Sequence, residues 1–437
     1  MWIYYLKLAW LSIKKNLFLS ALMVLAIAVG IATCLTTFTM YSVISGNPMV
    51  QKNETVFAVQ LDSWDPNIAY WTGNSVPFQL TYRDATAILA SDIPDKKVAM
   101  LKAGMSIQDA EMSVDTLVET TRMTTRDFFG MFDVDFVYGG PWLEKDDTDI
   151  NNVIVINEAI NNRIFQGKNS VGNPVLVEGE LFTVTGVVSD NWRLVPKVYD
   201  LNNGPFDGTP SMYVPFSLVS KRQYNGWGNY NGWSPEEYAS YQEFLQGEVV
   251  WIQSWVELRS AGQKQEFSQF LESYILEQKE QGRFQRPLKY VLSTPKEWLA
   301  INKAVSNDDR ILVGLSIAFL LVCLVNTVVM LLAKFLRKMP EAGIRRALGA
   351  TRQAIFGQHI LESLAIGVAG GLLGLIFSWF GLAGVREIYA PYTYVAVMSG
   401  FTIGASLLLA VGTSLFSGVL PAWHISLAPP AKYLKAQ

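Results

Sequence analysis

Apolar residues gather in four long runs, at residues 17–41, 311–333, 360–385 and 395–420. Three of the runs carry no charged residue, and the third carries only Glu362. A bilayer core about 30 Å thick needs about 20 apolar residues as a helix, so each run predicts a membrane span. We place the spans at 17–43, 310–333, 360–385 and 395–420. The first run is too long for the apolar part of a cleaved signal peptide, and no A-x-A-like site follows it, which favours a retained anchor.

Residues 44–309 show a different pattern, in which short strand-like segments are interspersed with helical periodicity. Strands are predicted at 54–61, 97–105, 115–123, 153–156, 174–178, 181–188, 211–214, 249–259 and 288–292. Helices are predicted at 79–90, 158–165, 264–281 and from 295 onward, and residues 224–241, rich in Gly, Asn, Trp and Tyr, indicate a long loop. The predicted fold class is four transmembrane helices with a large α+β domain, residues 44–309, between the first two.

Charge is divided unevenly between these regions. The chain has 35 basic and 38 acidic residues, but residues 1–43 and 310–437 hold 13 basic and 3 acidic ones, which leaves 22 basic and 35 acidic for 44–309. Eleven of these 13 basic residues lie in an amphipathic N-terminal segment (1–16), a loop (334–359) and a tail (421–437). The positive-inside rule places these segments in the cytoplasm and the α+β domain outside it. The acidic outer domain argues against nucleic acid as a partner.

Residue types that carry out catalysis or bind metals are scarce. Cys34 and Cys323 both fall in apolar runs, and His359 and His424 are too few for a zinc site. The sequence has no G-x-x-x-x-G-K-S/T, no H-E-x-x-H and no G-x-S-x-G motif. The acidic cluster at 144–149 is predicted to be a solvated loop. We therefore expect no enzymatic activity and no bound cofactor in this chain.

The most informative segment is PEAGIRRALGATR at 340–352, between the second and third spans. Glu341 stands four residues before Arg345, a spacing that favours an ion pair on one helix face. Gly349 supplies a helix stop, and Thr351 can cap the next helix. The segment predicts a short cytoplasmic helix; the alternative is a basic turn that only fixes the topology.

Small residues in the third span predict close helix packing. Gly367, Gly370, Gly371 and Gly374 form two small-xxx-small spacings, which let helix backbones approach each other in lipid. The contact could be made within the chain or with a second subunit. Asn326 is the most polar residue deep in a span, and we expect an interhelical hydrogen bond from it.

The segment at 340–352 resembles the E-I-G-I-R-R/K-A-L-G-A signature of the FtsX/MacB family of ABC transporter permeases. Residues 355–363, the glycine-rich span and the closing LPAW at 420–423 are also similar to that family. TTRDFF (124–129), VIVINE (153–158), FTVTGVV (182–188) and MYVP (212–215) resemble its MacB-like periplasmic core domain. Pro340, Ala342 and His424 depart from the family pattern, and 224–241 looks like an insertion.

The resemblance implies a mechanotransmission-type (type VII) permease of the bacterial inner membrane, with cytoplasmic termini and a periplasmic domain. That domain would divide into a porter-like part (50–122 and 248–295) and a sabre-like insertion (123–220). The coupling helix, which docks on an ABC ATPase, would comprise Glu341, Gly343, Ile344, Arg345, Arg346, Ala347, Leu348, Gly349 and Ala350. Motion of the ATPase would pass through the spans to the outer domain.

The implied partners are an ATPase on a separate chain that binds ATP and Mg, and a second permease copy or homologous permease. A periplasmic adaptor, an outer-membrane channel and membrane lipid complete the list. MacB-like export is the leading function. The alternatives are a lipoprotein-releasing (Lol-like) permease and an FtsX-like scaffold that activates a cell-wall hydrolase. A receptor-like module without an ATPase is disfavoured by the coupling segment.

Overall fold

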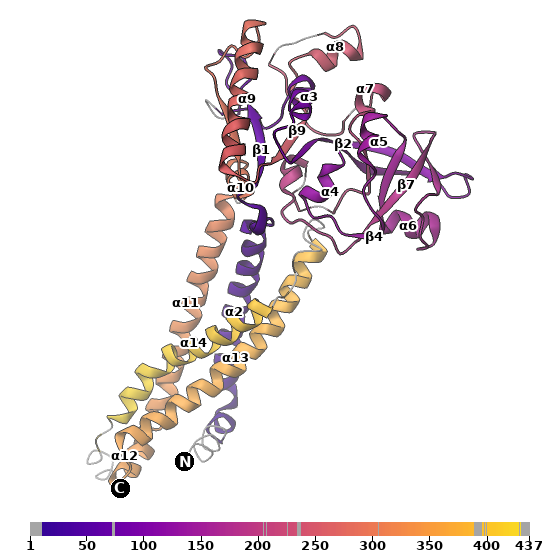
Figure 1. Ribbon diagram of the computed structural model, residues 1–437. Helices are drawn as coiled ribbons and strands as arrows, with labels where there is room; N and C mark the ends of the chain where they lie inside the picture. The colour runs from indigo at the N-terminus through magenta and orange to yellow at the C-terminus, as the bar shows by residue number, and fades with distance from the viewer. Residues whose placement is uncertain are drawn as a thin grey trace. The chain divides into compact units, whose positions relative to one another are not determined.

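The computed structural model describes residues 11–427 and 429, apart from 72–74, 204, 207, 225, 234–236, 305, 389–395, 397 and 399. The chain divides into two compact units, Met1–Ser45 with Val305–Gln437, and Gly46–Ala304 (Figure 1). The first unit is helical and the second is built on a sheet. Most of the predicted N-terminal segment 1–16 and most of the tail beyond Leu427 lie outside the described residues.

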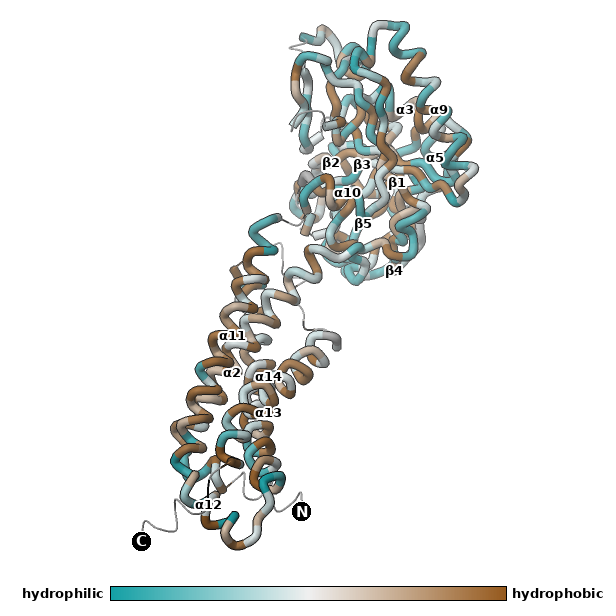
Figure 2. The backbone as a smooth tube through the Cα atoms, turned by 90° about the vertical axis from the view of Figure 1, so that its left-hand side faces the viewer, coloured by the Kyte–Doolittle hydropathy of each residue, from teal (hydrophilic) through white to brown (hydrophobic). Residues whose placement is uncertain are grey.

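Among the described residues, the helical unit contains four helices that are long and apolar enough to cross a membrane. They are α2 (Leu17–Ser45), α11 (Asn307–Leu336), α13 (Arg352–Ile388) and α14 (Gly400–Ser426), and Figure 2 shows hydrophobic residues along all four. α13 begins eight residues before the predicted third span, and α14 continues six residues past the predicted fourth. An apolar run marks only the part of a helix that suits lipid, whereas capping groups and polar turns decide where the helix ends.

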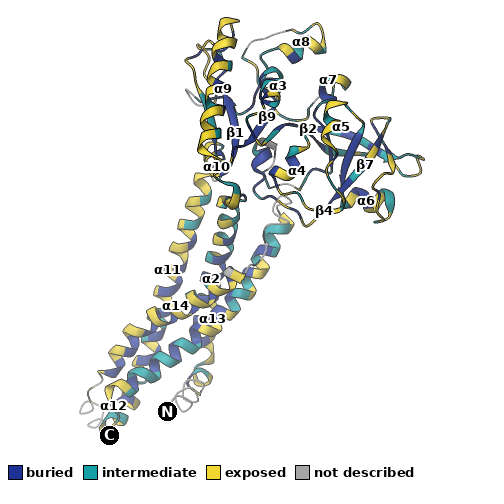
Figure 3. Cartoon of the chain, in the orientation of Figure 1, coloured by how far each residue is buried: buried dark blue, intermediate teal, exposed yellow. Residues whose placement is uncertain are grey.

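The four glycines of α13 face two neighbours within the chain. A Cβ at Gly367 or Gly371 would meet Ser414 or Ala410 of α14 at 1.5 and 2.3 Å, respectively. A Cβ at Gly370 would meet Ile27 of α2 at 2.7 Å, and one at Gly374 would meet the Ala28 carbonyl at 3.1 Å. Alternate glycines therefore admit α14 and α2 on two faces of α13, and all four are buried; Figure 3 shows buried residues along this helix.

The second unit is organised around one ten-stranded mixed sheet. Its strands are β1 (Val56–Leu61), β2 (Lys96–Asp109), β3 (Leu117–Thr124), β4 (Phe136–Gly139), β5 (Val153–Asn157), β6 (Pro174–Val177), β7 (Glu180–Val188), β8 (Met212–Pro215), β9 (Gln253–Glu257) and β10 (Tyr290–Ser293). The order is β10-β1-β9-β2-β3-β8-β5-β7-β4, and β6 pairs with β2 and β7. The pairs β3–β8 and β5–β7 are parallel, and the other pairs are antiparallel.

Helices and two hydrophobic cores cover the two faces of this sheet. The helices are α3 (Tyr82–Ala90), α4 (Asp127–Met131), α5 (Glu144–Thr148), α6 (Glu158–Phe165), α7 (Leu218–Arg222), α8 (Tyr241–Gln246), α9 (Ala261–Glu280) and α10 (Pro295–Ile301), with short 3-10 turns at Val50–Lys52 and Val198–Asn203. Phe57 and Val59 of β1 join one core with α9, whereas Val56 and Ala58 join an aromatic core with α4 and α10. Alternate side chains of a strand point to opposite faces, so β1 is buried on both.

The strands predicted for the porter-like and sabre-like parts belong to the same sheet. β10, β1, β9 and β2 lie on one side of β3, and β8, β5, β7 and β4 lie on the other. Pairing of Thr121 with Met212 and of Thr124 with Pro215 joins the two halves. The division into two subdomains remains a prediction. The helix predicted at 79–90 begins only at Tyr82, because the Thr81 side chain caps it by accepting a bond from Asp84 N at 3.2 Å.

Candidate coupling site

A short helix, α12 (Met339–Ala347), lies between α11 and α13. It contains Glu341, Gly343, Ile344, Arg345, Arg346 and Ala347, while Leu348, Gly349 and Ala350 form the turn that follows. Gly349 has a φ of +99°, a left-handed conformation that ends the helix at no steric cost to glycine. Thr351 Oγ1 then accepts a hydrogen bond from Ala354 N at 3.2 Å at the start of α13.

The two faces of α12 differ. Ala342 and Gly343 are buried, whereas Ile344 is 46% exposed and Leu348 is 83% exposed. The buried pair seats the helix on the bundle, and the small residue at 342 leaves room for this contact. The exposed pair forms an apolar surface that this chain leaves uncovered among its described residues.

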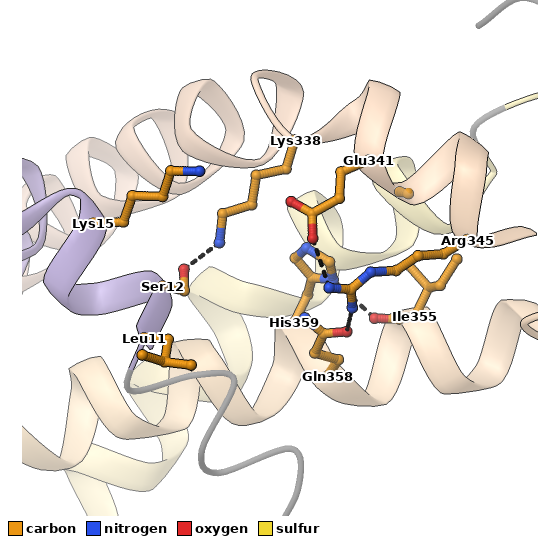
Figure 4. Close-up of a pocket in the computed structure, with 10 residues that line it drawn as sticks. Leu11, Ser12, Lys15, Lys338, Glu341, Arg345, Ile355, Gln358 and His359 are labelled. Atoms are coloured by element: carbon orange, nitrogen blue, oxygen red, sulfur yellow. Dashed lines mark hydrogen bonds and ion pairs between the residues drawn. The ribbon is translucent and has the colours of Figure 1, made fainter. Parts of the chain in front are cut away.

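Arg345 ties α12 to α13. Its guanidinium forms the predicted ion pair with Glu341 Oε1 at 2.6 Å, and it donates to Gln358 Oε1 of α13 at 3.0 Å. Figure 4 shows the guanidinium between these two acceptors. The pair with Glu341 lies within α12 and orients the guanidinium, and the bond to Gln358 then links α12 to α13.

Beside Arg345 is a pocket of about 160 Å³, whose lining includes Lys15, Lys338, Glu341 and Arg345 (Figure 4). His359 lines its buried side and stands edge-on to Phe335, with ring centroids 4.5 Å apart. The imidazole Nδ1 donates to the Ile355 carbonyl at 2.9 Å, since a carbonyl can only accept. The ring is thereby fixed between α11 and α13.

A buried ionic cluster that the sequence did not predict lies next to this pocket. Glu362 of α13 is fully buried, and its carboxylate contacts Lys334 Nζ at 2.8 Å and Lys338 Nζ at 3.1 Å. Lys334 also donates to Ser20 Oγ of α2 at 2.9 Å, and Ser12 bonds both Glu362 and Lys338. Three segments far apart in the chain are therefore joined through one carboxylate. Two features of the sequence could have indicated this cluster. Glu362 is the lone charge of its apolar run, and two lysines four residues apart follow the end of the preceding span.

The acidic cluster at 144–149 was predicted to be a solvated loop, but the structure places part of it in a helix and buries one of its carboxylates. Residues Glu144–Thr148 form α5, and Asp146, which is 8% exposed, accepts bonds from Leu143 N at 2.8 Å and Asn151 Nδ2 at 2.9 Å. Asp147 accepts from Arg126 N and from Trp142 Nε1, both at 3.0 Å. Burial, together with the neighbouring carboxylates, raises the pKa of Asp147 to about 6 despite these bonds. The prediction failed because the sequence does not show that Asp146 and Asp147 face inward, toward donors from both nearby and distant segments.

Asn326 does not form the expected interhelical hydrogen bond with the described residues of this chain. Its side chain is exposed on the surface of α11, and it makes no hydrogen bond to any residue that the structure describes. An amide at this depth in a 30-residue span is costly to leave facing lipid.

Together, four membrane-length helices, a sheet-based domain inserted after the first and a short braced helix between the second and third define a membrane permease. The chain matches the family model of the MacB-like periplasmic core domain over residues 20–273 and that of the FtsX-like permease C-terminal domain over 313–430. The chain therefore belongs to the MacB/FtsX family of ABC transporter permeases, which confirms the predicted family and the predicted architecture.

Curated relatives are similar along nearly the whole chain. The pyoverdine export ATP-binding/permease protein PvdT of Pseudomonas fluorescens is 22% identical over 443 residues, covering 98% of this chain and 59% of that protein. The macrolide export ATP-binding/permease protein MacB of Salmonella typhi is 22% identical over 423 residues, covering 96% and 58%. The chain thus spans about three fifths of the length of these relatives.

Solved structures of outer domains also align with the chain. The periplasmic region of MacB from Actinobacillus actinomycetemcomitans is 14% identical with a TM-score of 0.35, covering 58% of this chain and 94% of that one. The extracellular domain of the ABC-type transporter YknZ from Gram-positive bacteria is 16% identical with a TM-score of 0.34, covering 54% and 98%.

Proposed function

We propose that this chain is the permease subunit of an ATP-driven ABC transporter that transmits motion from a cytoplasmic ATPase to a periplasmic domain. The observation that carries the proposal is α12, a short helix between two spans whose seat is braced and whose apolar residues Ile344 and Leu348 are exposed. An exposed apolar patch next to polar residues is typical of a protein-binding surface. Here it would be covered by the groove of an ABC ATPase.

The ATPase is proposed to be a separate chain. The relatives carry names that combine ATP binding with a permease. The sequence printed here contains no phosphate-binding G-x-x-x-x-G-K-S/T motif. ATP and Mg would therefore be bound by the partner, and this chain would do mechanical work without catalysis of its own.

The proposed path of motion starts at α12. Arg345 would carry a displacement of α12 to Gln358 and hence to α13. The carboxylate of Glu362 would pass it to Lys334 of α11 and, through Ser20, to α2. Both α2 and α11 continue in the chain directly to the ends of the second unit, at Gly46 and Ala304. Rigid helices with few, strong contacts at one end are suited to transmit displacement to the other.

The transporter is proposed to be a dimer in the bacterial inner membrane, with both termini cytoplasmic and the domain 44–309 periplasmic. The basic segments beside the spans support this orientation. Exposure of Asn326 supports a second permease copy, since an amide facing another subunit can form the hydrogen bond that lipid cannot supply. Export with a periplasmic adaptor and an outer-membrane channel is the function we propose, on the strength of relatives named for export.

The proposal predicts that Arg345→Glu uncouples the ATPase. The substitution places two carboxylates at positions 341 and 345 and removes the bond to Gln358. We expect it to lower permease-dependent stimulation of ATP hydrolysis at least about tenfold, the effect of losing one strong charge-assisted contact. The measurement is ATP hydrolysis by the complex of the full chain and its co-purifying ATPase in lipid nanodiscs.

Arg352→Glu is the matched control, because Arg352 is an exposed arginine at the start of α13. It should leave the stimulation within about twofold of the wild type. Equal stimulation by the Arg345→Glu variant and the wild type, with both chains inserted, would contradict the assignment of α12. A lipoprotein chaperone in the purified complex, in place of an adaptor, would favour the lipoprotein-releasing function over export. A cell-wall hydrolase in the complex would favour the signalling-scaffold function.

A further inference from the structure

A cluster of aromatic side chains in the second unit is not used by the proposed function. Trp64 and Tyr70 are each 7% exposed and stand edge-on to one another, with ring centroids 4.9 Å apart. Phe78 stands edge-on to Tyr70 at 5.7 Å and to Trp71 at 6.0 Å. Trp71 is nevertheless 73% exposed. The cluster therefore has a buried base and an open indole at its edge.

These rings line a pocket of about 330 Å³ together with part of the loop that the sequence marked as an insertion. Tyr230 and Asn231 supply the loop side. Tyr230 is fixed, because its ring stacks on Trp251 at 5.1 Å and its hydroxyl accepts from Gly226 N at 2.5 Å. Asn231 is fixed through its backbone, which exchanges hydrogen bonds of 3.1 and 2.9 Å with Val250. The pocket wall is thus preformed on both sides.

Polar groups lie at the rim of the pocket and within the cluster that lines it. The indole N–H of Trp64 is buried and has no hydrogen-bond partner among the described residues. The same holds, within the described part of the chain, for the indole N–H of Trp233, which packs against this cluster. The amide side chains of Asn229 and Asn231 add donors and acceptors at the rim.

We propose that this pocket binds a neutral sugar ring of a carbohydrate. A pyranose has a face of C–H groups, which suits the electron-rich face of an indole or phenyl ring. Its edge of hydroxyl groups can exchange hydrogen bonds with the amides of Asn229 and Asn231. No aspartate, glutamate, lysine or arginine is among the described lining residues, so the ligand carries no obligatory charge at this site.

Two other ligand classes fit less well. An acyl chain would cover the rings but would offer no hydrogen-bond partner to the amides of Asn229 and Asn231, which is costly. A quaternary ammonium group favours an aromatic cage, which is usually completed by a nearby anion. The acids closest in sequence are engaged elsewhere, since Asp62 pairs with Arg286 at 3.0 Å and Asp65 accepts from Asn67 N at 2.7 Å.

The test is saturation-transfer NMR and tryptophan fluorescence titration of the full chain in lipid nanodiscs, because glycoside detergents would compete. The probes are maltotriose and triacetylchitotriose. We expect at least one probe to bind, with saturation transferred mainly to ring C–H protons. Trp71→Ala should weaken that binding about fivefold to tenfold, as removal of one stacked ring predicts. Trp71→Phe should restore most of the affinity.

Trp227→Ala is the matched control. Trp227 is 56% exposed in the same loop region but lies against Gly104 of β2 and does not line the pocket. It should leave probe binding unchanged. Asn231→Ala should weaken binding without disturbing the aromatic base. The proposal is overturned if neither trisaccharide binds the wild type, or if Trp71→Ala and Trp227→Ala reduce binding equally. Binding of tetramethylammonium alone, sensitive to Trp71→Ala, would overturn it in favour of a cation cage.

Discussion

Replacing Glu362 by glutamine removes the negative charge on which Lys334 and Lys338 converge. Lys334 is 2% exposed, and after the substitution its ammonium group keeps the Ser20 hydroxyl at 2.9 Å and a neutral amide oxygen at position 362 in place of the carboxylate. Removing one partner of a buried ion pair costs about 3–5 kcal/mol, because an uncompensated charge stays behind. The lower end applies here, since Lys338 has 18% of its side chain exposed and can turn to water. We therefore expect Glu362→Gln to lower the unfolding free energy by about 3 kcal/mol.

The assay is reversible unfolding of the full chain in bicelles, followed by circular dichroism during titration with sodium dodecyl sulfate. Glu387→Gln is the matched control, because it removes the same charge from an exposed position on the same helix. It should change the unfolding free energy by less than about 0.5 kcal/mol. When Lys334 is already replaced by Met, Glu362→Gln no longer leaves that lysine without its carboxylate. The loss of unfolding free energy should then be at least about 1 kcal/mol smaller than in the wild type. A loss below about 1 kcal/mol in the wild type, or equal losses in both backgrounds, would refute the idea that the cluster holds the bundle together.

Two further predictions test other parts of the structure. Gly371→Val should destabilise the bundle by about 1–3 kcal/mol, because its Cβ would lie 2.3 Å from that of Ala410. Gly384→Ala, where no atom of the described residues lies within 4 Å of the added Cβ, should be neutral or slightly stabilising in the same unfolding titration. Asp147 has a pKa of about 6 in the folded state, above the ordinary value near 3.9 that it has in the unfolded state. At a pH between these two pKa values, the folded state binds a proton that the unfolded state does not. The unfolding free energy should therefore rise as the pH falls from 7 to 5, and thermal melts of Asp147→Asn should show a smaller rise; identical pH profiles would refute the assignment.

The sequence predicted those features that depend on local pattern. Long apolar runs required four spans, and the Glu341–Arg345 spacing with Gly349 required a short helix that stops before Thr351. Features that depend on contacts between distant segments were missed. The lysines and Glu362 were recognised separately as topology signals and as a lone charge, but nothing in the pattern showed that they meet. Asp146 and Asp147 were predicted to be solvated, because the bonds to them form only after folding. Asp146 accepts from Leu143 and Asn151, and Asp147 accepts from Arg126 and Trp142.

The sheet illustrates the same limit. Most strands were predicted within a few residues, yet their order was not, and the parallel pairing of β3 with β8 joins segments about 90 residues apart. The alternate glycines of α13 predicted close packing but not which neighbours would pack. The structure places α14 and α2 there, both from the same chain.

The central claim, that α12 is the surface on which an ATPase acts, is tested most directly by crosslinking at its tip. The photoreactive residue p-benzoylphenylalanine is placed at Leu348, which is 83% exposed, and as a control at Ile388, which is 74% exposed at the far end of α13. Irradiated membranes should yield a covalent adduct from position 348 with a protein that mass spectrometry identifies by its P-loop as an ABC ATPase, and no such adduct from position 388. Absence of an ATPase adduct at 348, or equal adducts at both positions, would contradict the account.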